Sequence, residues 1–298
     1  MRWLLIATIV HAVACTPFPE QAEYMLFEPD ATRGGLGKPG PYGVGCSEVL
    51  VPVRAWDSFE MTVCWPADSS GQLGAKGPFP AVLLVHGGLV NRSRYQWLSG
   101  HFASRGYLVA APAHKAELAL LEQGNVSAAL DWLETASAND GVLSSALQAE
   151  STVLVGHSLG AVVAAMRWAQ DDRFYALVML AGFAASGTDL QTRAGSPSLT
   201  VGGQRDPLAT PTDVREGFER LPQPRWLGMV TGMHHYAWTD GNSAADLASD
   251  DTPARPVAAL RDDALRLIDA FVDTHLLGAT NAYKALAAGQ FPGLEVSQ

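Results

Sequence analysis

Ser158 lies at the centre of Gly156-His-Ser-Leu-Gly160, a pattern in which two glycines flank a serine at fixed spacing. An apolar run over 152–155 precedes the pattern and a small, apolar stretch over 161–166 follows it, which predicts a strand, a sharp turn and a helix. Such a turn exposes the hydroxyl and places a helix N-terminus behind it, where negative charge is favoured. We therefore predict that Ser158 is a nucleophile rather than a turn serine without chemistry.

A serine hydroxyl is a weak nucleophile at neutral pH and needs a general base, which in turn needs an orienting acid. Downstream, the apolar run 198–203 leads directly into a turn that contains Asp206. We predict Asp206 as the acid, because Asp213 suits a helix N-terminus better and Asp240 reads as a loop carboxylate.

The base is expected beyond the next strand, 226–231, which is followed by His234 and His235. The spacing alone does not decide which of the two histidines is the base. Since the eight histidines include no HxxxH or HxH pair with a carboxylate partner, the sequence predicts no metal site.

The oxygen of an attacked carbonyl group becomes an anion and needs fixed N–H donors. One donor is expected from Leu159, the residue after the nucleophile, and one from the loop after the apolar strand 80–85. That loop is His86-Gly-Gly-Leu89, in which we predict Gly88 as the donor and Leu89 as the substitute. His86 and His157 are interpreted as packing groups near the site.

Strand and helix patterns alternate along most of the chain and must position these residues. The alternation predicts one α/β domain over 46–298, with a mostly parallel sheet, helices on both faces and an antiparallel N-terminal hairpin. The stretch between Ala181 and Ser198 is too short for a large cap domain. Strands are predicted at 46–54, 59–65, 80–86, 107–112, 153–156, 176–181, 199–203 and 226–231, and helices at 94–105, 127–138 and 257–277.

The composition excludes nucleic acid as a partner. The 298-residue chain has a formal net charge of −10 and a pI near 5.2. It offers no basic stripe to displace counterions from phosphates.

Residues 1–15 are predicted to be an export signal, with Arg2 before an apolar run and Ala-Val-Ala before Cys15. Ala-Val-Ala-Cys resembles the lipobox of bacterial lipoproteins, in which the cysteine is lipidated and attaches the protein to a membrane, although leucine usually stands where Ala12 does. Plain secretion and a cytosolic location are the alternatives. The Pro- and Gly-rich stretch 16–45 is expected to be a linker or surface arm.

Cys46 and Cys64 lie on two consecutive strand-like runs. With Cys15 removed by lipidation or cleavage they form an even pair, which favours a cross-strand disulfide in an oxidising compartment. Two free thiols are the alternative.

With these motifs in place, the chain resembles the α/β-hydrolase superfamily. The likeness covers nearly the whole mature chain and is carried by segments 40–45, 86–88, 104–109, 156–160, 203–206 and 232–235. Within the superfamily, the chain is most similar to the branch of cutinase-like polyester hydrolases, dienelactone-hydrolase-like proteins and platelet-activating-factor acetylhydrolases. Ala161 departs from the pattern, since many members have another glycine there, and Ser158 replaces the cysteine nucleophile of true dienelactone hydrolases.

The resemblance implies a serine esterase that forms an acyl-enzyme intermediate and needs no cofactor. In the loop of this fold, a histidine three residues after a glycine and followed by an aromatic residue is the base, which favours His235, after Gly232, over His234. A non-catalytic surface binding protein on the same scaffold and an amide hydrolase are the alternatives.

Several apolar side chains are candidates for a substrate-binding rim around an open site. We predict Leu89, Tyr236 and Trp238 for this role, with Trp97 nearby, and ordinary packing is the competing interpretation. The acidic loop 246–251 is expected to be solvated rather than to hold a cation. The sequence names neither the acyl length nor the natural ester.

Overall fold

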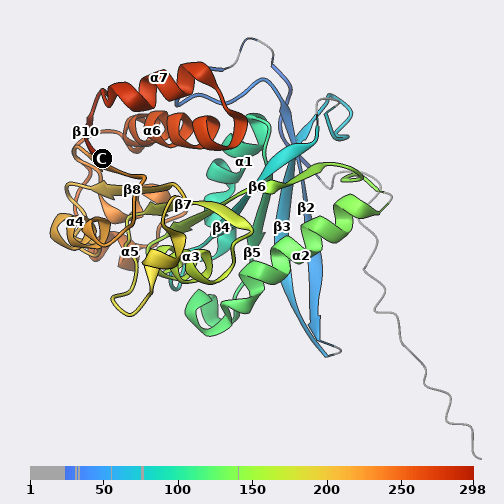
Figure 1. The fold of residues 1–298 in the computed structure, drawn as a ribbon, viewed down its shortest axis with the longest axis horizontal. Helices are drawn as coiled ribbons and strands as arrows, with labels where there is room; N and C mark the ends of the chain where they lie inside the picture. The colour runs from blue at the N-terminus through green and yellow to red at the C-terminus, as the bar shows by residue number, and fades with distance from the viewer. Residues whose placement is uncertain (1–23, 31, 33, 55, 75–76, 140) are drawn as a thin grey trace, which may run out of the picture.

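One twisted sheet runs through the computed structural model, with helices on both of its faces (Figure 1). The structure describes residues 24–298 except 31, 33, 55, 75–76 and 140. The predicted export signal and Cys15 lie outside the described residues. Within the described part of the chain, no helix is both long and apolar enough to span a membrane.

The strands join in the order β1-β2-β3-β5-β4-β6-β7-β8-β9-β10. In the middle of the sheet, from β5 to β9 in this order, each strand is parallel to its neighbour. The outer strands β1, β2, β3 and β10 pair antiparallel. The predicted mostly parallel sheet with an antiparallel N-terminal hairpin is thus confirmed. The strands are β1 (Tyr24–Phe27), β2 (Gly43–Arg54), β3 (Asp57–Ala67), β4 (Phe79–Val85), β5 (Leu108–Pro112), β6 (Leu147–His157), β7 (Phe174–Leu180), β8 (Ser198–Gly203), β9 (Arg225–Val230) and β10 (Leu294–Ser297).

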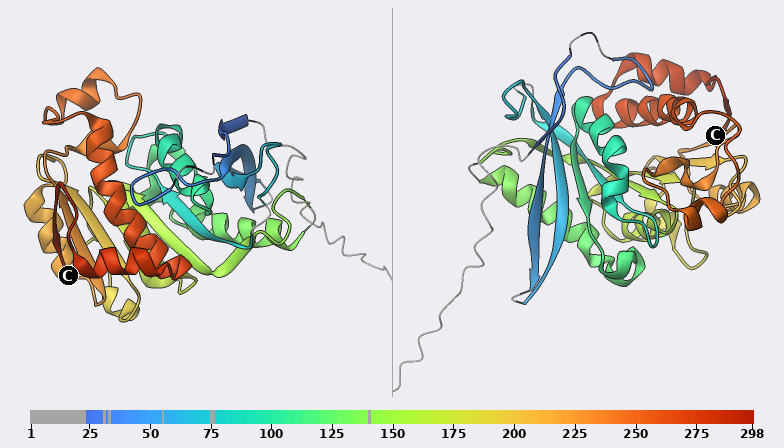
Figure 2. Two further views of the ribbon diagram at one scale, coloured as in Figure 1. Left: turned by 90° about the horizontal axis from the view of Figure 1, so that it is seen from above. Right: turned by 180° about the vertical axis from the view of Figure 1, so that it is seen from behind.

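Two apolar cores lie on opposite faces of the sheet because successive side chains of a strand point in opposite directions. In β4, Leu83 belongs to the core that includes residues of the helices at 124–138, 159–170 and 211–219. Leu84 belongs to the core that includes residues of the helices at 96–104, 257–277 and 280–288. Figure 2 shows the two helical layers from two further directions. The α-helices are α1 (Gln96–Ser104), α2 (Gly124–Ala138), α3 (Leu159–Gln170), α4 (Pro211–Glu219), α5 (Ala244–Ala248), α6 (Val257–Leu277) and α7 (Thr280–Ala288). The 3-10 helices are η1 (Arg92–Tyr95), η2 (Lys115–Glu117), η3 (Ala119–Glu122), η4 (Leu190–Arg193) and η5 (His235–Trp238).

The expected linker or surface arm is partly a packed element. β1 pairs with β2, so residues 24–27 extend the sheet. Farther along, the Gly37 N–H donates to Asp269 of α6 at 2.7 Å, and Arg105 donates to the main-chain oxygens of Gly35 and Lys38. These contacts join sequence-distant residues, which explains why composition alone suggested a linker.

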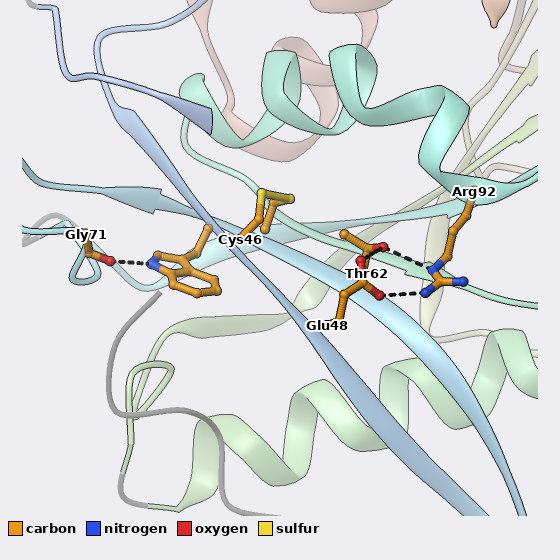
Figure 3. The surroundings of a disulfide bond; sticks show 7 residues. Cys46, Glu48, Thr62, Gly71 and Arg92 are labelled. Atoms are coloured by element: carbon orange, nitrogen blue, oxygen red, sulfur yellow. Dashed lines mark hydrogen bonds and ion pairs between the residues drawn. A yellow bond between two sulfur atoms is a disulfide. The ribbon is translucent and has the colours of Figure 1, made fainter. Parts of the chain in front are cut away.

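The β2–β3 hairpin carries a disulfide between Cys46 and Cys64, with a Cα–Cα distance of 4.1 Å (Figure 3). The two residues face each other in the antiparallel register. On the same hairpin, Thr62 donates to Glu48 at 2.6 Å, and Arg92 of η1 donates to both, at 3.1 Å and 2.6 Å (Figure 3). Since Arg92 follows the 86–89 loop closely, this network fixes the end of that loop to the hairpin.

Candidate active site

Ser158 stands between β6 and α3 on a strained backbone. Its φ is 55° and its ψ is −122°, a conformation that L-residues rarely adopt. The two glycines of the motif permit the tight turn, because a Cβ on Gly156 would lie 2.3 Å from the Gly160 oxygen and one on Gly160 would lie 2.2 Å from the Val85 oxygen. The local sequence thus forces the hydroxyl out of the turn, where it is partly exposed.

Ser158, His235 and Asp206 form one hydrogen-bonded chain. His235 Nε2 lies 2.9 Å from Ser158 Oγ, and His235 Nδ1 lies 2.8 Å from Asp206 Oδ2. His235 and Asp206 are buried. Because a carboxylate only accepts, Nδ1 carries the proton toward Asp206 and Nε2 is free to take a proton from the serine.

The orientation of Asp206 is fixed by its own turn. Its second oxygen, Oδ1, accepts the N–H groups of Leu208 and Ala209, each at 2.8 Å. Both oxygens of the carboxylate therefore accept hydrogen bonds: Oδ1 from the backbone and Oδ2 from His235.

Gly88 and Leu159, the predicted anion donors, lie against each other. A Cβ on Gly88 would approach the Leu159 Cβ to 3.3 Å, so the two residues are in close contact. Leu159 is the first residue of α3, so its N–H has no partner in the preceding helical turn. Among the described residues, no acceptor binds the Gly88 N–H.

Leu89 cannot act as the substitute donor that the sequence suggested. Its N–H donates to the Glu117 main-chain oxygen at 2.8 Å. The backbone of Leu89 has a φ of 59°, which turns this N–H toward η2. The predicted role of Leu89 as a second donor is therefore wrong. The sequence did not reveal this, because the acceptor, Glu117, lies 28 positions away.

Tyr95, which the sequence analysis did not single out, links the two halves of the site. Its hydroxyl accepts the Gly87 N–H at 2.9 Å and is hydrogen-bonded to His157 Nδ1 at 2.8 Å. His157 precedes the nucleophile, and its ring lies 4.9 Å from that of His235. Burial, and secondarily His235, lower the pKa of His157 well below its ordinary value, so His157 is a neutral packing group.

His86 and His114 form a second buried group beneath the 86–89 loop. His86 Nε2 lies 2.9 Å from His114 Nδ1 and 3.6 Å from Glu117 Oε2. Burial lowers the pKa of His86, and burial together with His86 lowers that of His114 to about 3. His86 is thus a packing group, as expected, and the pair is neutral at pH 7.

His234, the competing candidate for the base, contacts Asp250. Its Nδ1 lies 2.5 Å from Asp250 Oδ2. The Asp250 side chain is 0% exposed, so the expected solvation of loop 246–251 is wrong at this position. The sequence could not show that Asp250 is buried, because the next residue is also an aspartate and its side chain is an exposed partner of Arg205.

The three predicted rim residues differ in exposure. Leu89 is 76% exposed and Tyr236 is partly exposed. Trp238 is fully buried, stacked on Trp97 with ring centroids 6.4 Å apart. Trp238 therefore belongs to the core of the η5 region and cannot contact a substrate, which corrects its predicted role.

The chain matches a known protein family. Residues 81–250, more than half of the chain, match the model of the alpha/beta hydrolase family. No curated protein matches the chain. The matched segment includes Ser158, Asp206, His235 and the 86–89 loop.

Proposed function

Since the chain belongs to the alpha/beta hydrolase family, whose activity is hydrolytic, we propose that it is a serine-dependent carboxylic ester hydrolase. The observation that carries this proposal is the hydrogen-bonded chain from Ser158 through His235 to Asp206. The nucleophile, the base and the orienting acid make the contacts that acyl transfer requires.

In the proposed reaction, Ser158 Oγ bonds to the ester carbonyl carbon as its proton moves to His235 Nε2. Asp206 stabilises the imidazolium that forms. The N–H groups of Gly88 and Leu159 bind the oxyanion. Collapse of the tetrahedral intermediate releases the alcohol, which takes the proton from Nε2, and leaves an acyl-serine. A water molecule, deprotonated by Nε2, then bonds to the acyl carbon. The bond from that carbon to Ser158 Oγ breaks as Oγ takes the proton back from Nε2, which releases the acid and restores the serine.

The proposed substrates are esters with one part extending from an open site, as expected for the cutinase-like, dienelactone-hydrolase-like and acetylhydrolase branch. The exposed Leu89 beside Gly88 and the partly exposed Tyr236 beside His235 support an apolar substrate. A series of p-nitrophenyl esters of increasing acyl length identifies the preferred chain.

The decisive experiment compares the wild type with Ser158→Ala. We expect the wild type to hydrolyse a short p-nitrophenyl ester and to react with a fluorophosphonate, and the variant to lose at least about 10³-fold in kcat. Circular dichroism of the variant serves as the folding control. Retained turnover would refute Ser158 as nucleophile, and an unreactive wild type would favour a non-catalytic binding protein. Turnover of amide but not ester analogues would favour an amide hydrolase.

We further propose that the protein is exported and attached to a membrane through a lipidated Cys15. The disulfide between Cys46 and Cys64 supports an oxidising compartment. Mass spectrometry of the mature N-terminus tests this, since an unprocessed Met1 would contradict export and an unmodified mature terminus would leave plain secretion.

A further inference from the structure

Asp250 is a buried carboxylate that the proposed reaction does not use. Its Oδ1 accepts the His235 N–H at 3.0 Å and the Asp251 N–H at 2.8 Å. Its Oδ2 accepts the Tyr236 N–H at 2.6 Å and contacts His234 Nδ1. Three of the partners lie at 234–236, around the start of η5, and Asp250 and Asp251 follow α5. One side chain therefore joins the segment that carries the base to the segment that follows α5.

Two of the three main-chain contacts of Asp250, those with His235 and Tyr236, lie at the start of η5, where N–H groups lack partners within the helix. His235, the proposed base, is the first residue of η5, and the residue before it, His234, makes no capping bond with its side chain. Asp250 supplies that cap from a position 15 residues downstream of His235.

The charge of Asp250 is maintained despite burial. Burial alone raises the pKa of its carboxyl, but hydrogen bonds with His234 and with the N–H groups of Tyr236 and His235 outweigh that effect and lower it. The carboxylate is therefore ionised at neutral pH. A neutral amide in its place keeps the size but lacks the capacity to accept all four bonds.

We propose that Asp250 is a positioning residue for catalysis, whose carboxylate holds the main chain of His235 and Tyr236 so that His235 Nε2 stays within reach of Ser158. This inference rests on the proposed function. The site thus contains two His–Asp pairs with different tasks. Asp206 orients the imidazole of the base, whereas Asp250 fixes the backbone from which that imidazole projects.

The test is Asp250→Asn, with Asp251→Asn as the matched control. We expect the Asp250 variant to lose about 10- to 100-fold in kcat toward a p-nitrophenyl ester, with KM changed by less than about threefold, because a small misplacement of a catalytic group affects the chemical step most. Fluorophosphonate labelling of Ser158 should slow by a similar factor. Asp251 is exposed and faces Arg205, so its variant should retain kcat within about twofold.

A merely structural Asp250 would lower the melting temperature but leave kcat per folded molecule unchanged, and that result overturns the inference. An unreactive wild type would instead refute the proposed function, whereas a reactive wild type with an equally reactive Asp250 variant refutes only the role of Asp250.

A measurement on the wild type covers the case in which the variant does not fold. The amides of His235 and Tyr236 should exchange with solvent at least about 100-fold more slowly than unprotected loop amides. Fast exchange at both amides would show that Asp250 does not hold them, and would also overturn the inference.

Discussion

Replacing Tyr95 by phenylalanine removes one oxygen atom at the contact between the anion-binding loop and the nucleophile turn. Tyr95 is fully buried, and its hydroxyl joins the Gly87 N–H to His157 Nδ1. The ring remains, so the substitution leaves almost no cavity. Two buried polar groups lose their partner at the same time.

The expected loss of stability follows from those two groups. A buried donor or acceptor left unsatisfied costs about 1–3 kcal/mol, so we expect the free energy of unfolding to fall by about 2–6 kcal/mol in total. Activity should fall as well. Gly87 precedes Gly88, and a loosened loop loses part of an oxyanion contact that is worth roughly 10²-fold or more in kcat, so we expect a decrease of about 10-fold.

Urea unfolding measures the first effect and ester hydrolysis per folded molecule measures the second. Tyr107→Phe is the matched control. Tyr107 is also fully buried, and its hydroxyl donates to Asp273 at 2.7 Å in the α1–α6 layer, away from Ser158. Since only one buried group loses its partner, the control should lose about 1–3 kcal/mol of stability and keep kcat within about twofold.

The reasoning is refuted if Tyr95→Phe destabilises the protein but hydrolyses ester as fast as the wild type. That outcome would mean that the position of Gly88 does not depend on Tyr95. Equal losses of kcat in both variants would be just as damaging, because they would trace the effect to stability and not to the loop.

Two further predictions concern stability. Burial lowers the pKa values of His86, His114 and His157, that of His114 to about 3. The unfolded chain takes up these protons near pH 6.5, so stability should be full above that pH and fall as the pH is lowered, by about 2 kcal/mol at pH 5 for His114 alone. Urea unfolding at pH 7 and pH 5 measures this, and a His114→Gln variant with an unchanged slope would contradict it. Replacing Cys46 and Cys64 together by alanine removes a disulfide between residues 18 positions apart in the sequence. Since the unfolded chain then gains conformational entropy, the free energy of unfolding should fall by about 3 kcal/mol. Thermal unfolding with and without reductant checks this, since reductant should affect only the wild type.

Much of the fold was predictable because its signals are local. Apolar runs and helical periodicity located the central strands, and α6 was predicted at its observed bounds of Val257–Leu277. β1, β10 and α7 were not predicted. β1 and β10 are edge strands of four residues each, paired antiparallel at the two ends of the sheet. Such short segments carry too little periodicity to be distinguished from loops.

In the candidate site, too, some residues were predictable from local signals and others were not. Ser158, Asp206 and His235 each follow a strand that the sequence reveals, and parallel strands end at one edge of a sheet, so their proximity follows from their order. The roles of Tyr95 and Asp250 could not be foreseen, because their contacts join separate loops whose relative position depends on how helices pack.

By itself, the sequence determined that a serine stands on a strained turn between a strand and a helix, with an acid and two histidines after later strands. These features are local and need only backbone sterics and periodicity. Only the tertiary structure decided which histidine faces Ser158, that Leu89 has no free N–H, that Trp238 is buried and that Asp250 caps η5. Each of these depends on hydrogen-bond direction and burial between distant segments, which residue types and spacing do not encode.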